Sequence, residues 1–284
     1  MSDADGILKM RLAPIAAALL IASCAAHANA TEYSFTILNS AYIQKGVGIN
    51  DNFGIGQAIP LGINDNGTIV GYISSDANDG LGFIYSSTTG VVSSAPKFVG
   101  PRSINNSGVI YGSYSGPDPL ASQVGTLGYL SAYVSTIGPI RVPVDVQFYY
   151  PGYGGINNLN EVAGPNFFIT ASGSVIPTNQ FYSDVNDGGT LLLRSQGNAI
   201  NNLGDYVTNG SVVHNGISQS LTLPAALSGN GLFLTGINDL GQVIGYTGSV
   251  SFLATPLPVP EPTSFVMVLT GLIGLAGLRR RNTE

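Results

Sequence analysis

Very few residues of this 284-residue chain have the types and spacing that catalysis or metal binding requires. His214 is the one histidine outside the first thirty residues, so three-histidine and H-E-x-x-H zinc sites cannot form there. The sequence has no G-x-S-x-G turn for a serine nucleophile and no phosphate-binding G-x-x-x-x-G-K loop. We therefore expect no catalytic residue, no metal and no cofactor, and we expect His214 to be a structural residue of a strand.

Carboxylates are more numerous, but they show no pairing pattern. Residues 31–258 contain twelve acidic and five basic residues, a net charge of −7. Hydrolysis of a glycosidic bond needs two opposed carboxylates, and acids outside turn positions, such as Asp145, Glu161 and Asp205, have no evident partner. A glycoside hydrolase is therefore a remote alternative. The shortage of basic residues also excludes a nucleic-acid-binding surface.

One aromatic cluster could contact a ligand. Tyr149, Tyr150 and Tyr153 lie in a glycine- and proline-rich stretch, residues 148–155, in the longest gap between repeats. Tyrosine rings on such a loop can stack on sugar rings, which makes these three residues candidate glycan contacts. The pattern also fits a strand that leads into a turn, with its rings half-buried between repeats, and we favour this more ordinary interpretation.

The chain repeats one short motif: isoleucine, asparagine, then Asp or Asn, then any residue, then glycine. Five clear copies have their leading asparagines at a mean spacing of 43.5 residues. These asparagines are Asn64, Asn105, Asn157, Asn201 and Asn238. Weaker copies occupy residues 48–51 and 184–188. Such a fixed period is the signature of a repeat architecture.

The motif has the composition of a hairpin turn. The asparagine side chain can hydrogen-bond the backbone two residues on, and the position three residues after the asparagine requires a positive φ. Glycine occupies that position in four copies, and the third copy has Asn160, the non-glycine type that best tolerates this conformation. A calcium loop is the functional alternative at residues 76–80, but its ligand spacing is off by one and the distal glutamate is missing.

Each copy continues with a short aromatic strand and a further strand, and no segment between residues 31 and 255 has a helical period. Three or four short strands in each unit of about 44 residues are typical of a propeller blade. The sequence therefore predicts an all-β, propeller-like ring of about five imperfect repeats. The last repeat has two clear strands, residues 242–246 and 250–254, so we expect residues 33–38 to complete it.

The repeats resemble HAF-type extracellular repeats, in which a G-I-N-x-x-G-x-x-x-G-Y half is followed by an H-A-F-L-Y half. Residues 62–72 keep the first half, whereas residues 81–85 (LGFIY) lack the histidine of the second. The resemblance implies an extracellular repeat architecture and implies no activity.

Residues 1–30 have the features of a cleavable export signal. Basic residues precede an apolar run, and Ala28 and Ala30 form an A-x-A cleavage site. Cleavage after Ala30 would leave a chain without cysteine. Two alternatives stay open: translation could start at Met10, and Cys24 could be a lipidated N-terminus.

The C-terminal segment, residues 256–284, combines three features in a fixed order. A proline-rich linker precedes an uncharged stretch of fourteen residues, which is followed by an arginine cluster. The residues concerned are Pro260, Glu261 and Pro262 in the linker and Arg279, Arg280 and Arg281 in the cluster. A helix of about sixteen residues would rise about 24 Å, which is marginal for a hydrocarbon core of about 30 Å. The sequence predicts a short transmembrane helix with its arginines on the cytoplasmic side.

This C-terminal segment resembles the PEP-CTERM sorting signal of exported proteins in Gram-negative bacteria, a tail that is also named an ice-binding-protein C-terminal domain. The resemblance implies an exosortase-type transpeptidase as partner and removal of the tail. It also implies an inner-membrane-anchored precursor that later reaches the cell surface or the extracellular matrix, and bacteria with such proteins commonly build polysaccharide matrices.

Three parts are thus predicted: a signal peptide over residues 1–30, a repeat-built ectodomain over residues 31–255 and a sorting segment over residues 256–284. The expected function is that of an exported, non-catalytic surface or extracellular-matrix protein. A glycan-binding module of the polysaccharide matrix is the alternative.

Overall fold

The computed structural model describes residues 31–48, 56–75, 78–95, 98–114, 129–143, 154–227, 231–248 and 250–258. The predicted signal peptide, the predicted transmembrane helix and the tyrosine cluster lie outside these ranges. Within the described part of the chain, no helix has the length and apolar character needed to span a membrane. The predictions for the two ends therefore stay predictions.

The regular secondary structure of the described residues is nearly all β-strand, as the sequence predicts. In chain order the strands are β1 (Tyr33–Leu38), β2 (Gln57–Ile63), β3 (Thr68–Ser75), β4 (Asn78–Ser86), β5 (Val92–Ser94), β6 (Phe98–Ile104), β7 (Ile110–Tyr114), β8 (Tyr129–Val134), β9 (Gly138–Pro143), β10 (Gly155–Ile156), β11 (Val162–Ile169), β12 (Val175–Val185), β13 (Leu191–Leu193), β14 (Ala199–Ile200), β15 (Tyr206–Val207), β16 (Ser211–His214), β17 (Ile217–Ser220), β18 (Leu232–Ile237), β19 (Val243–Thr247) and β20 (Val250–Pro256). The helical elements are α2 (Ser40–Gly46) and the 3-10 helix η2 (Ala225–Leu227).

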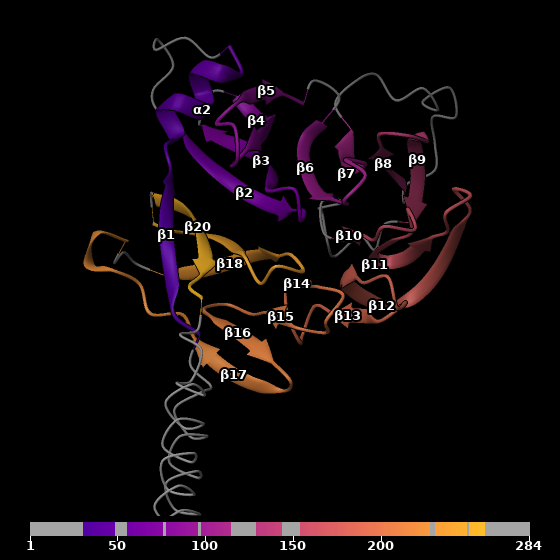
Figure 1. Ribbon diagram of the computed structural model, residues 1–284. Coiled ribbons are helices and arrows are strands. Elements are labelled where there is room, and N and C mark those ends of the chain that lie inside the picture. Colours follow the sequence, from indigo (N-terminus) through magenta and orange to yellow (C-terminus); the bar gives the residue numbers. More distant parts are fainter. Residues whose placement is uncertain are drawn as a thin grey trace, which may run out of the picture. The chain divides into compact units, whose positions relative to one another are not determined.

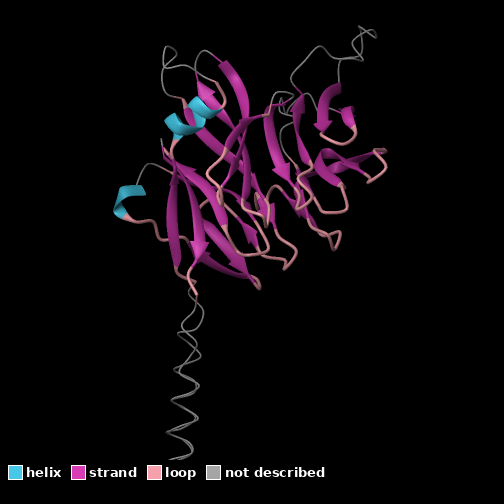
Figure 2. Cartoon of the chain, turned by 45° about the horizontal axis from the view of Figure 1, so that its top comes forward, coloured by secondary structure: helices cyan, strands magenta, loops and turns pink. Residues whose placement is uncertain are grey.

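These strands form five four-stranded sheets, which agrees with the expected number of repeats. Four sheets are consecutive in the chain, with the orders β2-β3-β4-β5, β6-β7-β8-β9, β10-β11-β12-β13 and β14-β15-β16-β17. Within residues 35–255 the sheets follow one another around a common centre (Figure 1; Figure 2 shows the same strands from another side). The first strand of each sheet lies on the inside, where β2 contacts both β6 and β18. The fold is a β-propeller.

The fifth sheet closes the ring with the N-terminal strand. Its order is β18-β19-β20-β1, so the prediction that residues 33–38 complete the last repeat is confirmed. Phe35 contacts Phe252 edge to face, with ring centroids 5.7 Å apart. The expected strand count of that repeat was wrong, because β18 precedes the motif turn and adds a third C-terminal strand. Each sheet begins before its motif, and the turn joins the sheet's first two strands.

Buried aromatic rings pack over glycines of the neighbouring strand. Phe83 lies opposite Gly71, and Phe252 lies opposite Gly245. Both rings are fully buried, and a Cβ atom placed on these glycines would lie 2.8 Å from Phe83 and 3.1 Å from Phe252. The glycine four residues after the motif glycine and the aromatic strand that follows it therefore form one packing unit.

The short helix α2 contradicts the expectation of a segment without helices. Asn39 caps it, because its side-chain oxygen accepts a hydrogen bond from the backbone N–H of Tyr42 at 3.1 Å. Ile43 and Gln44 are buried, and Gln44 donates to the carbonyl of Gly56 at 3.0 Å. Seven residues are too few for a helical period to be visible in the sequence.

Candidate functional site

The motif turns meet at one end of the first strands and form a closed circuit of hydrogen bonds. Each leading asparagine donates from its Nδ2 atom to the backbone carbonyl of the leading asparagine in the next turn, at 3.0–3.2 Å. Its Oδ1 atom accepts from the backbone N–H four residues later, at 2.8–2.9 Å. We call this set the asparagine ring; its members are Asn64, Asn105, Asn157, Asn186, Asn201 and Asn238.

A second circuit runs through the residue after each asparagine. The backbone N–H of one such residue donates to the Oδ1 atom of the next, at 2.7–2.9 Å. The six residues are Asp65, Asn106, Asn158, Asp187, Asn202 and Asp239. Because the circuit needs only a side-chain oxygen at this distance from the backbone, aspartate and asparagine are interchangeable here.

The asparagine ring has six members, although the sheets number five. The turn at residues 184–188 is a full member of the ring, which corrects its interpretation as a weaker copy of the motif. The reason is β12: its residues from Val175 to Phe181 pair with β11, and its last residues, from Tyr182 to Val185, pair with β13. One sheet therefore contributes two turns, those of Asn157 and Asn186.

The backbone of the turns follows the prediction. Gly67, Gly108, Gly204 and Gly241 have φ values of 72°, 79°, 84° and 70°, and Asn160 has a φ of 64°. The carboxylates of this end accept hydrogen bonds from neighbouring turns, for example both oxygens of Asp187 from Asn158. Among the described residues no group of three His, Cys, Asp or Glu side chains could hold a metal ion. The turn end is thus a hydrogen-bonded framework.

Asp184 is buried beside this framework. Its two carboxylate oxygens accept from the backbone N–H groups of Val185 and Ile200, each at 2.9 Å. Burial raises the pKa of Asp184 to about 7, and these two hydrogen bonds act in the opposite direction.

A cavity of about 180 Å³ opens towards the other end of the first strands, and we call it the axial cavity. Two positions of the repeat, counted from the motif asparagine, provide most of its lining. The residue three before that asparagine lines the cavity in all six copies, as Leu61, Arg102, Gly154, Ser183, Asn198 and Thr235. The residue eight after it lines the cavity in four copies, as Tyr72, Arg194, Asn209 and Tyr246. Ile59 and Phe233 complete the lining.

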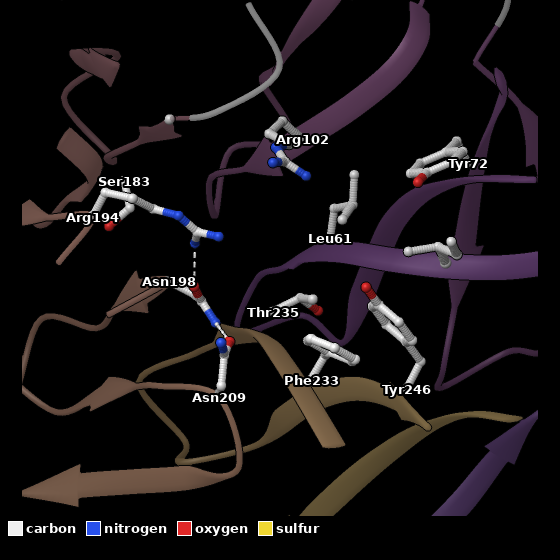
Figure 3. A pocket seen from close by; sticks show the side chains of 12 residues that line it. Leu61, Tyr72, Arg102, Ser183, Arg194, Asn198, Asn209, Phe233, Thr235 and Tyr246 are labelled. Atoms are coloured by element: carbon white, nitrogen blue, oxygen red, sulfur yellow. Dashed lines mark hydrogen bonds between the residues drawn. The ribbon is translucent and has the colours of Figure 1, made fainter. Parts of the chain in front are cut away.

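Two arginines give the axial cavity its charge. Arg102 is half-buried on β6, and Arg194 lies just after β13. The Nη1 atom of Arg194 donates to the Oδ1 atom of Asn198. The Nδ2 atom of Asn198 in turn donates to the carbonyl of Leu234 at 2.7 Å and to Asn209 at 3.1 Å. This chain of contacts connects Arg194 to the backbone of β18, and Figure 3 shows its part from Arg194 through Asn198 to Asn209.

Aromatic rings form another wall of the axial cavity. Phe233 and Tyr246 are stacked, with ring centroids 5.1 Å apart and an interplanar angle of 21°. Tyr72 lies nearby, and Figure 3 shows the hydroxyls of Tyr72 and Tyr246 directed towards the central space. Aromatic faces beside amide and guanidinium donors can bind a ligand that has both an apolar face and polar edges.

Most residues singled out in the sequence lie away from this cavity or outside the described residues. His214, at the end of β16, has its Nδ1 atom 2.7 Å from Asp205 and its Nε2 atom 2.9 Å from Asn215. Glu161 accepts a hydrogen bond from Asn157. Outside the described residues lie the cleavage site, the sorting residues, the tyrosine cluster and Asp145, namely Ala28, Ala30, Pro260, Glu261, Pro262, Arg279, Arg280, Arg281, Tyr149, Tyr150, Tyr153 and Asp145.

Most cavity residues were missed because no motif contains them, although Tyr72 is the last residue of the G-I-N-x-x-G-x-x-x-G-Y pattern. Arg102 and Arg194 share no local pattern, and one precedes its motif asparagine whereas the other follows it. An alignment of the six repeats on that asparagine would have placed the two arginines at defined positions, three residues before it and eight residues after it. At both positions the residue type differs between copies.

Comparison with known proteins gives no family. No family model matches the chain, and no curated protein matches it. Among solved structures, virginiamycin B lyase from Staphylococcus aureus is similar, at 12% identity over 81% of this chain and 76% of that chain, with a TM-score of 0.30. A streptogramin B lyase is similar at 12% identity over 81% and 74% of the two chains, with a TM-score of 0.31. Similarity at this level assigns no reaction to the present chain.

Proposed function

We propose that this chain is an exported surface or extracellular-matrix protein whose propeller binds a saccharide in the axial cavity without cleaving it. The observation that carries the proposal is the lining of that cavity. Position by position, the repeats place six different residue types there, whereas they keep the turn end uniform. A stacked aromatic pair, amide groups and guanidinium groups around one opening match the apolar face and the hydroxyl edge of a sugar.

The chemistry of the lining favours binding over hydrolysis. Glycoside hydrolases use two carboxylates on either side of the scissile bond. Among the described residues that line the axial cavity none is acidic. The carboxylates of Glu161 and Asp205 instead form hydrogen bonds within and next to the motif turns.

Export and sorting form the second half of the proposal and rest on the sequence of the two ends. The signal peptide would direct the chain across the inner membrane, and the PEP-CTERM-like segment would hold it there until an exosortase removes the tail. The propeller would then be displayed at the cell surface or in a polysaccharide matrix, where a saccharide ligand is abundant.

Glycan binding is tested with the full-length protein in mild detergent on an array of bacterial polysaccharides and oligosaccharides. Phe233→Ala and Tyr246→Ala should each weaken saccharide binding at least tenfold, because they remove the stacking face of the cavity. The control is Leu240→Ala, which truncates an exposed apolar side chain on a motif turn and should leave binding unchanged. Shortened glycan products after incubation, or equal loss of binding in the control, would contradict the proposal.

Sorting is tested in a host that has an exosortase. Replacing Glu261 with Gln should leave membrane insertion intact and block processing, so the full-length chain should accumulate in the inner membrane. Replacing Arg279, Arg280 and Arg281 with neutral residues should impair retention itself. Mass spectrometry of the mature C-terminus gives the answer, because surface-exposed wild-type protein that still ends at Glu284 would refute processing.

A further inference from the structure

We infer that the axial cavity is selective for an acidic saccharide and binds the carboxylate of a terminal uronate residue. This inference rests on the proposed function, since it names the class of sugar that the same cavity would hold. It adds the charge of the ligand, the residues that contact that charge and the part of the glycan chain that enters the cavity.

Basic residues are concentrated at the axial cavity. Residues 31–258 contain five basic and twelve acidic residues, yet two of the five basic residues line this one cavity. None of the described residues that line the cavity is acidic. Amide groups can also serve a neutral sugar, whereas the charge and planar fork of arginine fit the two oxygens of a carboxylate best.

The propeller holds the two arginines in different ways. Arg194 donates to Asn198, which is fixed by Asn209 and by the backbone carbonyl of Leu234, so its guanidinium group is positioned before a ligand arrives. Arg102 lies close enough to the fully buried Tyr111 for its positive charge to lower the pKa of that phenol, against the larger increase caused by burial. Its charge therefore acts partly within the propeller, where electrostatic interactions are stronger than in water.

The arginines and the aromatic wall lie on different sides of the axial cavity. Figure 3 shows Arg102 and Arg194 on one side of the central space and Phe233 and Tyr246 on the other. A uronate ring has an apolar C–H face and carries its carboxylate at one edge. It can therefore lie against the stacked aromatic pair while its carboxylate points to the arginines.

The size of the cavity limits what enters. Its volume of about 180 Å³ is below the roughly 300–1,000 Å³ of pockets that enclose drug-sized ligands. One sugar residue fits such a space better than an enclosed oligosaccharide does. The net charge of −7 over residues 31–258 opposes contact with the middle of a long polyanion, so the end of the chain is the part to bind.

The experiment compares matched sugars on the full-length protein by isothermal titration calorimetry. We expect D-glucuronate to bind at least tenfold more tightly than D-glucose and than the methyl ester of glucuronate, which keeps the shape and removes the charge. Arg102→Gln and Arg194→Gln should each weaken glucuronate binding at least tenfold and weaken D-glucose binding much less, so the preference for glucuronate over glucose should fall. Lys45→Gln, which removes a basic residue of α2 away from the cavity, is the matched control.

The outcomes separate this inference from the proposed function. Equal affinity for glucuronate, its methyl ester and glucose would overturn the inference and leave saccharide binding in place. Competition by inorganic phosphate at the same concentration as glucuronate would also overturn it, because the cavity would then be a general anion site. Binding to none of the sugars, with melting temperatures of all variants unchanged, would overturn both.

Discussion

At the turn end of the first strands the six repeats place the same residue, asparagine, whereas three residues earlier they place leucine, arginine, glycine, serine, asparagine and threonine. The difference follows from what each end must do. A closed circuit of hydrogen bonds makes the same geometric demand on every turn, so one residue type recurs. The axial cavity has no such demand, and each copy is free to contribute a different side chain.

The comparison teaches where binding chemistry lies in a repeat protein of this kind. The motif that makes the repeats recognisable is the part whose polar groups are already used within the fold. The asparagine ring is buried and each of its side chains both donates and accepts. Groups that could recognise a ligand lie at the positions where the repeats disagree.

The largest expected effect comes from breaking the asparagine ring. Asn105→Ala removes the donor to the carbonyl of Asn157 and the acceptor for the backbone N–H of Val109, both buried. We expect the free energy of unfolding to fall by at least about 2 kcal/mol, since each unsatisfied buried group costs about 1–3 kcal/mol. Arg102→Ala, three residues earlier, should cost less than about 1 kcal/mol. Equal costs in urea denaturation would remove the distinction between the two ends.

A smaller effect is expected from the backbone of the same turns. Gly108 has a φ of 79°, and nothing lies within 4 Å of the place where its Cβ atom would be. Gly108→Val should therefore cost about 1–3 kcal/mol through backbone strain alone, whereas Gly108→Asn should cost clearly less. Gly100→Val is the control, because Gly100 lies in the same sheet, has open space and lacks a positive φ. Thermal melts in which the Val and Asn variants are equally destabilised would show that the turn geometry is wrong.

A third effect is a dependence on pH at Asp184, which lies between Ser183 and Asn186 at the end of β12. The folded protein holds this proton to about pH 7, whereas an unfolded aspartate releases it near pH 4 (~3.9). The stability that this group contributes is therefore fully present below about pH 4 and is lost as the pH rises through 7.

Asp184→Asn cannot ionise and should lack that loss. We expect the melting temperature of the wild type, relative to the Asn variant, to decrease between pH 5 and pH 8. A difference that stays constant over this range would mean that the Asp184 carboxyl is charged throughout.

Much of the fold follows from the sequence because local physics repeats in it. The glycine-rich turns, the strand character and the spacing of Asn64 to Asn238 predict a ring of short sheets, and the unpaired strand at residues 33–38 predicts its closure. The sixth turn was recognised only as a weaker copy, because no local pattern shows that β12 pairs with two partners along its eleven residues and so brings a second turn into one sheet.

The candidate site escaped for a different reason. Arg102 and Arg194 are 92 positions apart, and only the curvature of the ring brings them to one cavity. A residue type that recurs at a fixed spacing can be recognised in the sequence. Residues that differ from repeat to repeat can be recognised as one site only after the repeats are superimposed. In the sequence the two arginines contribute only to the count of basic residues, and no pattern there indicates that they share a cavity.

The pairing of β1 with β20 also sets the order in which the chain can fold. The closing strand is the first strand of the propeller to be synthesised, and its partner lies more than 200 residues later. Contacts so distant in sequence form slowly, because the intervening chain must be ordered before they can stabilise it. During synthesis the ring therefore stays open, with unpaired strand edges available to chaperones or to other chains. Release of the complete chain, more than any local step, is the event that locks the native state.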